Sequence, residues 1–188
     1  MPAILDVGCG NNKTPGAVGI DANPRTQADI LHDLDVYPWP LEDATFDHII
    51  CRHIVEHVRD LVRFMEELHR VARPGATVEI VTPHFSNRYS YTDPTHLRHL
   101  SLFSLDYFVA AEPPRLGLLT RAFETLAPVA DFYSAARFAK RRAFLRFARP
   151  YRWLGVQWLA NRFPAYYEAY WAFILPARDL YFTLEVVK

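Results

Sequence analysis

The N-terminal stretch of the chain constrains its fold more than any other part. An apolar run, Ile4-Leu5-Asp6-Val7, breaks into Gly8 and Gly10, and a second short run, Gly19-Ile20, ends on the carboxylate of Asp21. Glycine allows the tight turn and the close backbone approach that a nucleotide needs where a buried strand ends. An acid at the end of the next strand is placed to accept hydrogen bonds from a ribose diol. The pattern predicts an α/β protein with a nucleotide site at the carboxyl edge of a parallel sheet.

The spacing of these residues argues against two other nucleotide sites. A dinucleotide site needs Gly-x-Gly-x-x-Gly, with an acid about 20 residues further on. Here Lys13 stands where the third glycine would be, and Asp21 follows Gly10 by only eleven residues. The phosphate-binding pattern Gly-x-x-x-x-Gly-Lys-Ser/Thr does not occur.

Hydrophobic periodicity and turn residues predict the remaining elements. The helix expected over residues 60–72 carries apolar side chains at three- and four-residue steps and is followed by Pro74-Gly75. The expected strands are Ala3–Val7, a segment ending at Asp21, Ala28–Leu34, Phe46–His53, Thr77–Val81, a region within Ala122–Phe132 and Tyr181–Val187, with a further helix over Ser104–Ala111.

Several short motifs share their order with one family. Asp6-Val7-Gly8-Cys9-Gly10, Phe46-Asp47, Glu56-His57-Val58 and Leu68-x-x-Val71-x-x-Pro74-Gly75 resemble successive motifs of the class I S-adenosylmethionine-dependent methyltransferases, in particular the small bacterial type 11-like domains. The resemblance covers residues 3 to about 83. It implies a single Rossmann-like domain with a mostly parallel seven-stranded sheet and an antiparallel C-terminal strand. Residues 1–83 would bind S-adenosylmethionine, and residues 84–188 would form the substrate and lid half.

The resemblance also assigns the cofactor residues. Gly8 to Asn11 would line the methionine end, Asp21 would bind the ribose and Asp33 the adenine amino group. The segment 11–18 is too short for the helix that usually follows the first strand, so we expect that helix to be shortened or absent, with side-chain donors replacing its N-terminus. The full expected set is Asp6, Gly8, Cys9, Gly10, Asn11, Asn12, Lys13, Asp21, Asp33, Cys51, Arg52 and His53.

Residues for the methyl acceptor are expected after the central strands. The polar segment 85–99 is the candidate substrate loop, and a base helps when the acceptor is a hydroxyl group. The candidate catalytic residues are His96, which Asp93 could orient, and then His84, His53 and Asp93 itself. The acceptor is expected to be a small molecule that is methylated on oxygen or nitrogen. A glycan- or lipid-linked molecule is one alternative. His96 and His99 could join Asp93 and His84 in a metal site, but loop histidines are common and no thiolate joins them, so no metal site is assigned.

The two halves of the chain differ in charge. Residues 1–80 hold thirteen acids and seven bases, a net charge of −6, whereas residues 81–188 have a net charge of +6. The segment 132–167 contains eight bases and no acid, interleaved with aromatic residues. It predicts a basic amphipathic helix, split at Pro150, that packs on the core, clamps an anionic substrate or binds an anionic membrane surface through residues Arg137 to Arg152. Nucleic acid is disfavoured because no recognition motif accompanies the charge.

Composition leaves two alternatives to an enzyme open. The pocket could bind S-adenosylmethionine without catalysis, or the basic segment could make the chain an adaptor for a membrane or a nucleic acid. Two cysteines make no disulfide framework, and neither a signal peptide nor a membrane-spanning run is evident, so the cytoplasm is the expected location, with peripheral membrane association left open. The sequence does not indicate the oligomeric state.

Overall fold

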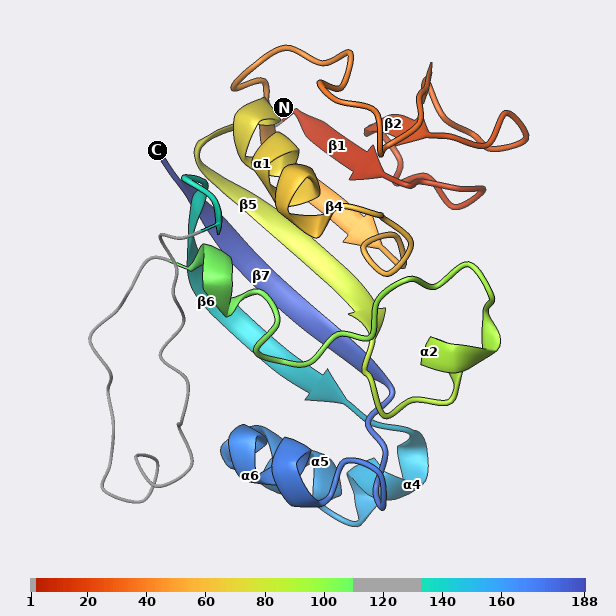
Figure 1. The fold of residues 1–188 in the computed structure, drawn as a ribbon, viewed down its shortest axis with the longest axis vertical. Coiled ribbons are helices and arrows are strands. Elements are labelled where there is room, and N and C mark those ends of the chain that lie inside the picture. Colours follow the sequence, from red (N-terminus) through yellow and green to blue (C-terminus); the bar gives the residue numbers. More distant parts are fainter. Residues whose placement is uncertain (1–2, 110–132) are drawn as a thin grey trace.

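The computed structural model describes residues 3–109 and 133–188, which form a seven-stranded sheet with the order β3-β2-β1-β4-β5-β7-β6 (Figure 1). Strands β1 to β5 pair in parallel, and β7 runs antiparallel to both β5 and β6. The predicted α/β fold, with its antiparallel C-terminal strand, is therefore confirmed. The strands are β1 (Ile4–Val7), β2 (Val18–Asp21), β3 (Ile30–Leu31), β4 (Phe46–Arg52), β5 (Ala72–Pro83), β6 (Arg137–Arg146) and β7 (Asp179–Val187).

Helix α1 (Leu61–Val71) follows β4, close to the predicted bounds. The side chain of Asp60 accepts a hydrogen bond from the Arg63 N–H at 3.0 Å and so caps its N-terminus. Phe64, Met65 and Leu68 are buried against the sheet, as their spacing predicts. The other helices are short: α2 (Tyr89–Thr92), the 3₁₀ turn η1 (Asp106–Phe108), α4 (Arg149–Trp153), α5 (Val156–Arg162) and α6 (Pro164–Tyr170).

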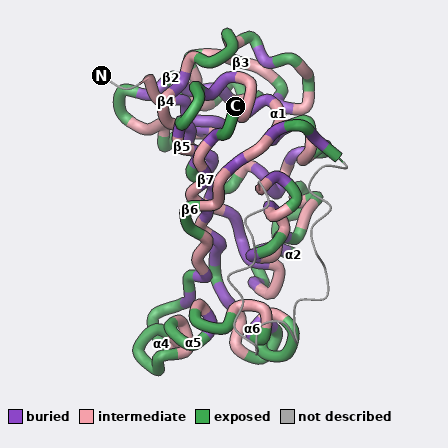
Figure 2. The backbone as a smooth tube through the Cα atoms, turned by 90° about the vertical axis from the view of Figure 1, so that its left-hand side faces the viewer, coloured by how far each residue is buried: buried purple, intermediate pink, exposed green. Residues whose placement is uncertain are grey.

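The described helices cover the two faces of the sheet unequally. Helices α1 and α2 lie on one side, and no described helix lies over β4, β5 and β7 on the other (Figures 1 and 2). The segments after β1 and β2 form turns only, which confirms the expected absence of a helix after the first strand. Alternate residues of β7 consequently differ: Phe182 and Leu184 are buried, whereas Tyr181 and Thr183 are partly exposed. Among the described residues, 3–109 and 133–188, this face of the sheet is therefore open.

The basic segment 132–167 does not form the predicted amphipathic helix. Residues Arg137–Arg146 form β6, which pairs with β7 along its length with a register shift between Lys140 and Arg142. Pairing with β7 buries Phe138 and Leu145, and this tertiary pairing outweighs a helical spacing of aromatic residues. Pro150 occupies the first turn of α4, where proline fits, rather than splitting a longer helix.

Three smaller predictions also differ. The third strand contains only Ile30 and Leu31 instead of seven residues, because only two residues pair with β2. Of the helix expected over 104–111, the structure describes residues 104–109, and only the 3₁₀ turn η1 forms there. The strand region expected over 122–132 lies outside the described residues.

Candidate active site

The turn after β1 borders open space. Gly8 has φ +64° and its N–H donates to the Ile20 carbonyl at 2.8 Å, and a Cβ there would lie 2.6 Å from the Ile54 side chain. Gly10 has φ +52°, and a Cβ at Gly10 would meet no atom within 4 Å. Both positions therefore require glycine for their backbone conformation, and Gly10 leaves room for a ligand to approach the main chain.

The carboxylate of Asp21 lies directly beside this turn. Its Oδ2 accepts from the Gly10 N–H at 2.9 Å, and its Oδ1 accepts from the Asn23 N–H at 2.8 Å. Each carboxylate oxygen can accept two hydrogen bonds, so both keep capacity for a diol. Asp33, beyond β3, is exposed, and its Oδ1 accepts from the Asp35 N–H at 3.0 Å.

Asp6 is a buried carboxylate with one oxygen unsatisfied. It is 1% exposed, and its Oδ2 accepts from Arg52 Nη2 at 2.6 Å and from the Thr14 N–H at 2.7 Å. Its Oδ1 has no hydrogen-bond partner. Because an unpaired buried acceptor is costly, this oxygen favours a ligand with a cationic donor, and the α-ammonium group of S-adenosylmethionine is one. The donor set and the space at Gly10 therefore fit the expected cofactor.

Five of the expected cofactor residues, Cys51, Cys9, Lys13, Asn11 and Asn12, differ in how their side chains are placed. Cys51 is fully buried in the core, and burial raises the pKa of its thiol, so it cannot border the sulfonium through its side chain. Burial likewise raises the pKa of Cys9, with Asp21 and Asp6 adding to the effect. Lys13 Nζ pairs with Asp29 at 2.8 Å and is thereby committed to a protein carboxylate. Asn11 and Asn12 are exposed beside the turn.

A pocket of about 360 Å³ lies beyond the carboxyl ends of β4 and β5. Substrate sites in open α/β sheets lie at this edge. Three of the four predicted catalytic residues, His53, Asp93 and His96, line it, although they come from segments forty residues apart. Its other lining residues are Glu56, His57, Pro83, Asn87, Tyr89, Thr92, Arg178 and Asp179.

His84, the fourth candidate, lies outside this pocket. It is fully buried, Ser86 N–H donates to its Nδ1 at 3.2 Å, and its Nε2 lies 3.1 Å from Glu168 Oε1. Glu168 Oε1 also accepts from the Leu102 N–H at 2.7 Å. His84 therefore has no ring nitrogen available to a substrate, and it ties α6 to the segment after β5.

His53 adopts φ +54°, which is uncommon for a residue with a side chain. Its Nδ1 lies 3.3 Å from Oε1 of Glu56, and this carboxylate holds the pKa of His53 above its usual range. Glu56 is 1% exposed and accepts from Thr82 Oγ1 at 3.0 Å through Oε2.

His96 is oriented differently from the prediction. Its Nδ1 donates to the Ser90 carbonyl at 3.2 Å, whereas Asp93 Oδ2 lies 3.8 Å from its Nε2. Asp93 instead accepts from the N–H and the hydroxyl of Thr95. The Ser90 carbonyl therefore orients the ring and leaves Nε2 of the neutral ring unprotonated.

Glu56, His57 and Asp179 also line this pocket, although the sequence did not mark them as acceptor residues. Glu56-His57 belongs to one of the motifs that carry the family resemblance. Asp179 begins β7 and reaches the pocket because β7 pairs with β5 up to Pro83. No local signal marks Asp179, since only the antiparallel pairing brings it there.

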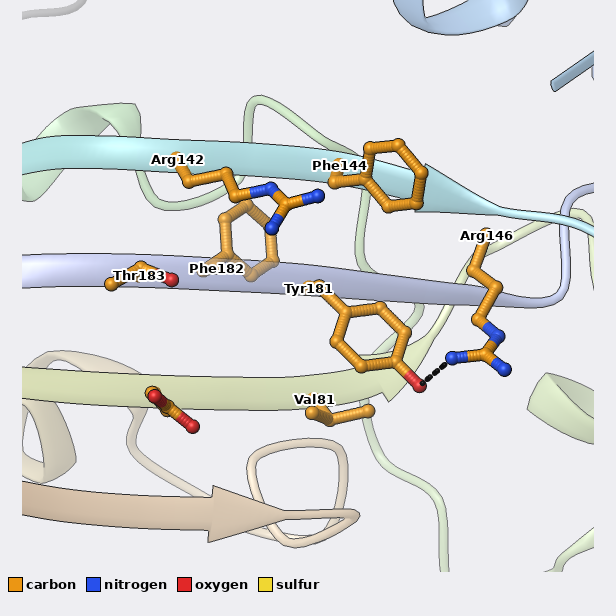
Figure 3. A pocket seen from close by; sticks show the side chains of 8 residues that line it. Val81, Arg142, Phe144, Arg146, Tyr181, Phe182 and Thr183 are labelled. Carbon is orange, nitrogen blue, oxygen red and sulfur yellow. Dashed lines mark hydrogen bonds between the residues drawn. The ribbon is translucent and has the colours of Figure 1, made fainter. Parts of the chain in front are cut away.

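A second pocket, of about 310 Å³, lies on the open sheet face (Figure 3). Its side chains come from β5, β7 and β6, and Arg142 lies over the Phe144 ring at 5.0 Å. Arg146 Nη1 donates to Tyr181 Oη at 3.4 Å. Phe144 also lines a third pocket of about 380 Å³, with Arg152, Gln157, Trp158, Asn161 and Arg162.

The fold and the site define the class of protein. A mostly parallel sheet of this strand order, with a glycine turn after β1, an acid ending β2 and a pocket at its carboxyl edge, is a Rossmann-like nucleotide-binding fold. Residues 5–80 match the family model described as a methyltransferase domain. Over these residues the chain is similar to the S-adenosylmethionine-dependent methyltransferases, whose cofactor is S-adenosylmethionine.

Two curated relatives are similar to parts of the chain. A Mycolicibacterium smegmatis protein described as a probable S-adenosylmethionine-dependent methyltransferase is 29% identical over 70% of this chain and 56% of its own length. The ajmaline N-methyltransferase of Rauvolfia serpentina is 32% identical over 41% of this chain and 28% of its own length. The chain thus spans about half, or less, of the curated relatives it matches.

Solved structures agree on the fold. A crystal structure of an S-adenosylmethionine-dependent methyltransferase from Mesorhizobium loti superposes with a TM-score of 0.53, covering 98% of this chain and 90% of that chain. At 15% sequence identity, this likeness concerns the fold alone.

Proposed function

We propose that the chain transfers a methyl group from S-adenosylmethionine to an oxygen or nitrogen of a small-molecule acceptor held in the 360 Å³ pocket. The observation that carries this proposal is the junction at the end of β4. Arg52 binds Asp6 and the Asn12 carbonyl on the cofactor side, and the next residue, His53, lines the pocket. Two consecutive residues therefore join the two sites that a direct transfer must bring together.

The cofactor would supply an electrophilic methyl group on a sulfonium, and the protein would position it. Asp21 would hold the ribose, Asp6 Oδ1 would accept from the ammonium group, and the Gly10 main chain would pack against the methionine end. Most of the rate can come from such positioning, because the displacement requires the acceptor atom to lie in line with the methyl carbon and the sulfur.

A histidine of the pocket would take the proton when the acceptor is a hydroxyl group. His53 and His96 both line the pocket, and each has a neutral form that can accept a proton. Because the pKa of His53 is raised, a step that uses His53 as the base would gain rate as the pH rises through that pKa. The name of one relative, ajmaline N-methyltransferase, supports a small-molecule acceptor. Within this class of small molecules, the acceptor proposed here includes glycan-linked and lipid-linked molecules.

Calorimetric titration with S-adenosylmethionine and S-adenosylhomocysteine tests the cofactor site. We expect saturable binding by the wild type and a loss of at least about tenfold in affinity for Asp21→Ala, because hydrogen bonds to a charged group contribute about 1.5–3 kcal/mol. Asp43→Ala, at an exposed carboxylate paired with Arg70 away from the turn, is the matched control and should bind as the wild type does. Absence of binding by the wild type would contradict the proposal.

A non-catalytic role is the alternative, and product analysis distinguishes it. The enzyme should form S-adenosylhomocysteine in the presence of a suitable small hydroxyl or amine acceptor. A chain that binds the cofactor but forms no product with any member of a broad acceptor panel would favour a binding protein.

We also propose that the C-terminal helices bind an anionic membrane surface. Trp153, Leu154, Trp158 and Phe173 are between 71% and 82% exposed, which is unusual for side chains of this size. Arg149 and Arg152 lie on α4 and Arg162 lies on α5, and no ion pair joins them to an acid of the described residues. Exposed tryptophan and leucine beside arginine are typical of helices that lie in the interface of a bilayer. Among the described residues, no helix has the length and apolarity to cross one.

Vesicle flotation tests this surface. We expect binding to vesicles containing anionic phosphatidylglycerol, weaker binding to phosphatidylcholine alone, and a decrease with salt. Arg152→Glu/Arg162→Glu should lower the partition coefficient by at least about fivefold per arginine. The control, Arg25→Glu/Arg63→Glu, changes the same charge at exposed positions near β2 and on α1. Equal losses in both variants, or no binding by the wild type, would contradict the membrane proposal.

A further inference from the structure

Three side chains of the metal-ligating kind meet in the acceptor pocket. Glu56, His57 and His96 each offer one ligand atom, and these atoms lie within 4.8 Å of one another. Glu56 and His57 follow β4, whereas His96 belongs to the loop after α2. The main chain holds the two segments together, because the N–H groups of Leu97 and Arg98 donate to the Glu56 carbonyl at 2.8 and 3.2 Å.

Hydrogen bonds fix the tautomers of both histidines. The Ser90 carbonyl can only accept, so the Nδ1 of His96 carries the proton. Thr95 Oγ1 donates its single proton to Asp93 Oδ1 at 2.6 Å, so it must accept from the Nδ1 of His57 at 3.0 Å. Both neutral rings therefore leave Nε2 with a free lone pair. Metal-ligating histidines show this arrangement, with the second nitrogen donating to an acceptor behind the ring.

Glu56 provides an independent observation. Its side chain is 99% buried, and its Oε1 has no hydrogen-bond partner, although Oε2 accepts from Thr82. A carboxylate oxygen without a donor is costly inside a protein unless a charge compensates it. The nearest side-chain nitrogen, His53 Nδ1, lies 3.3 Å from Oε1 and makes no hydrogen bond with it in this structure.

We propose that Glu56, His57 and His96 bind a divalent cation in this pocket. Two imidazoles and one carboxylate suit Zn²⁺, Mn²⁺ or Fe²⁺, whereas Mg²⁺ prefers a shell of oxygen ligands. Three protein ligands leave a coordination position free toward the pocket. Resting on the proposed function, that position would take an acceptor oxygen, and His53 would remain as the histidine that accepts its proton.

The experiment uses the full chain after removal of metals with a chelator, and it omits S-adenosylmethionine. Calorimetric titration with Zn²⁺ and Mn²⁺ should show one saturable site, and Mg²⁺ should bind more weakly. His96→Ala and Glu56→Gln should each lower the Zn²⁺ affinity by at least about tenfold. Glu56→Gln keeps a side chain of the same size, and unchanged thermal midpoints would show that both variants are folded.

His32→Ala is the matched control, because His32 bonds the Val36 carbonyl in a loop that contributes no residue to the pocket. It should bind Zn²⁺ as the wild type does. No saturable binding by the wild type, equal affinity in His96→Ala, or an equal loss in the control would each overturn the proposal. Since no readout depends on methyl transfer, failure here is distinguishable from failure of the proposed function.

Discussion

At the scale of single residues, the buried carboxylate of Asp6 depends on its partner across the sheet edge. Arg52 Nη2 donates to Asp6 at 2.6 Å, to the Asn12 carbonyl at 3.0 Å and to the Thr14 hydroxyl at 2.8 Å. One guanidinium group therefore holds the whole turn after β1 against β4. The turn contains no helix, so this pair performs part of the ordering that a helix would otherwise provide.

Arg52→Ala should lower the free energy of unfolding by about 1–3 kcal/mol, because it removes the charged donor of the buried Asp6 carboxylate and leaves only the Thr14 N–H. Urea denaturation measures this change. Arg59→Ala is the control, since Arg59 is highly exposed and lies 3.8 Å from Asp35, and it should change stability by less than about 0.5 kcal/mol. Equal effects of the two variants would contradict this role of Arg52.

A second residue-scale prediction concerns acid stability. Hydrogen bonds from Arg73, and then from the Ala3 N–H, hold the pKa of Asp47 below its ordinary value. A lowered pKa stabilises the fold above the unfolded value of about 3.9, and the gain is lost as the pH falls through the lower folded pKa. Arg73→Met should therefore lower the thermal midpoint at pH 6, and the difference from the wild type should shrink toward pH 2. A difference that does not depend on pH would contradict this.

At the scale of elements, helix α1 connects the cofactor half to the core. Its first turn has no acidic residue, so Asp60 at the N-cap is the main compensation for the free N–H groups there. The Trp39 ring packs edge-to-face on Phe64 of this helix, and the backbone N–H of Trp39 donates to Glu67 Oε2 at 2.8 Å. The helix thereby orders the loop between β3 and β4.

Asp60→Ala should cost about 1 kcal/mol of stability, as the loss of an N-cap usually does. Asp60→Ser keeps an oxygen acceptor at this position and should retain most of the stability. Chemical denaturation of both variants measures the difference. If serine were as destabilising as alanine, the cap would not be the cause.

At the scale of the whole molecule, the described structure leaves one face of the sheet open. In β7, Leu184 is fully buried on the covered face, and its neighbour Thr183 lies partly exposed on the other. The same alternation places Arg142, Phe144 and Tyr181 around the pocket of the open face (Figure 3).

Leu184→Ala should therefore destabilise the protein by about 2–5 kcal/mol through lost burial and a cavity. Thr183→Ala, one position away, should cost less than about 1 kcal/mol. Thermal and urea unfolding of the pair measure the asymmetry directly. A large loss for Thr183→Ala would mean that this face is covered in the folded protein.

Local sequence patterns determined the parts of this protein that depend on short-range physics. The glycine turn, the acid at the end of β2 and helix α1 were predicted because their signals are backbone freedom, strand termination and a helical period. The family motifs added the cofactor, and the alternation of Phe182 and Leu184 predicted the last strand. Each of these signals lies within a few neighbouring residues.

Tertiary structure decided the rest. Residues Arg137–Arg146 became a strand because β7 offers a partner, although their own spacing favoured a helix. His84 is not available as a catalytic residue, because its Nε2 lies against Glu168 of α6. Glu56, His57 and His96 lie together because N–H groups of the loop after α2 donate to the Glu56 carbonyl. Contacts between residues forty to eighty positions apart leave no periodic trace in the sequence, so only the folded chain shows which histidines line the pocket.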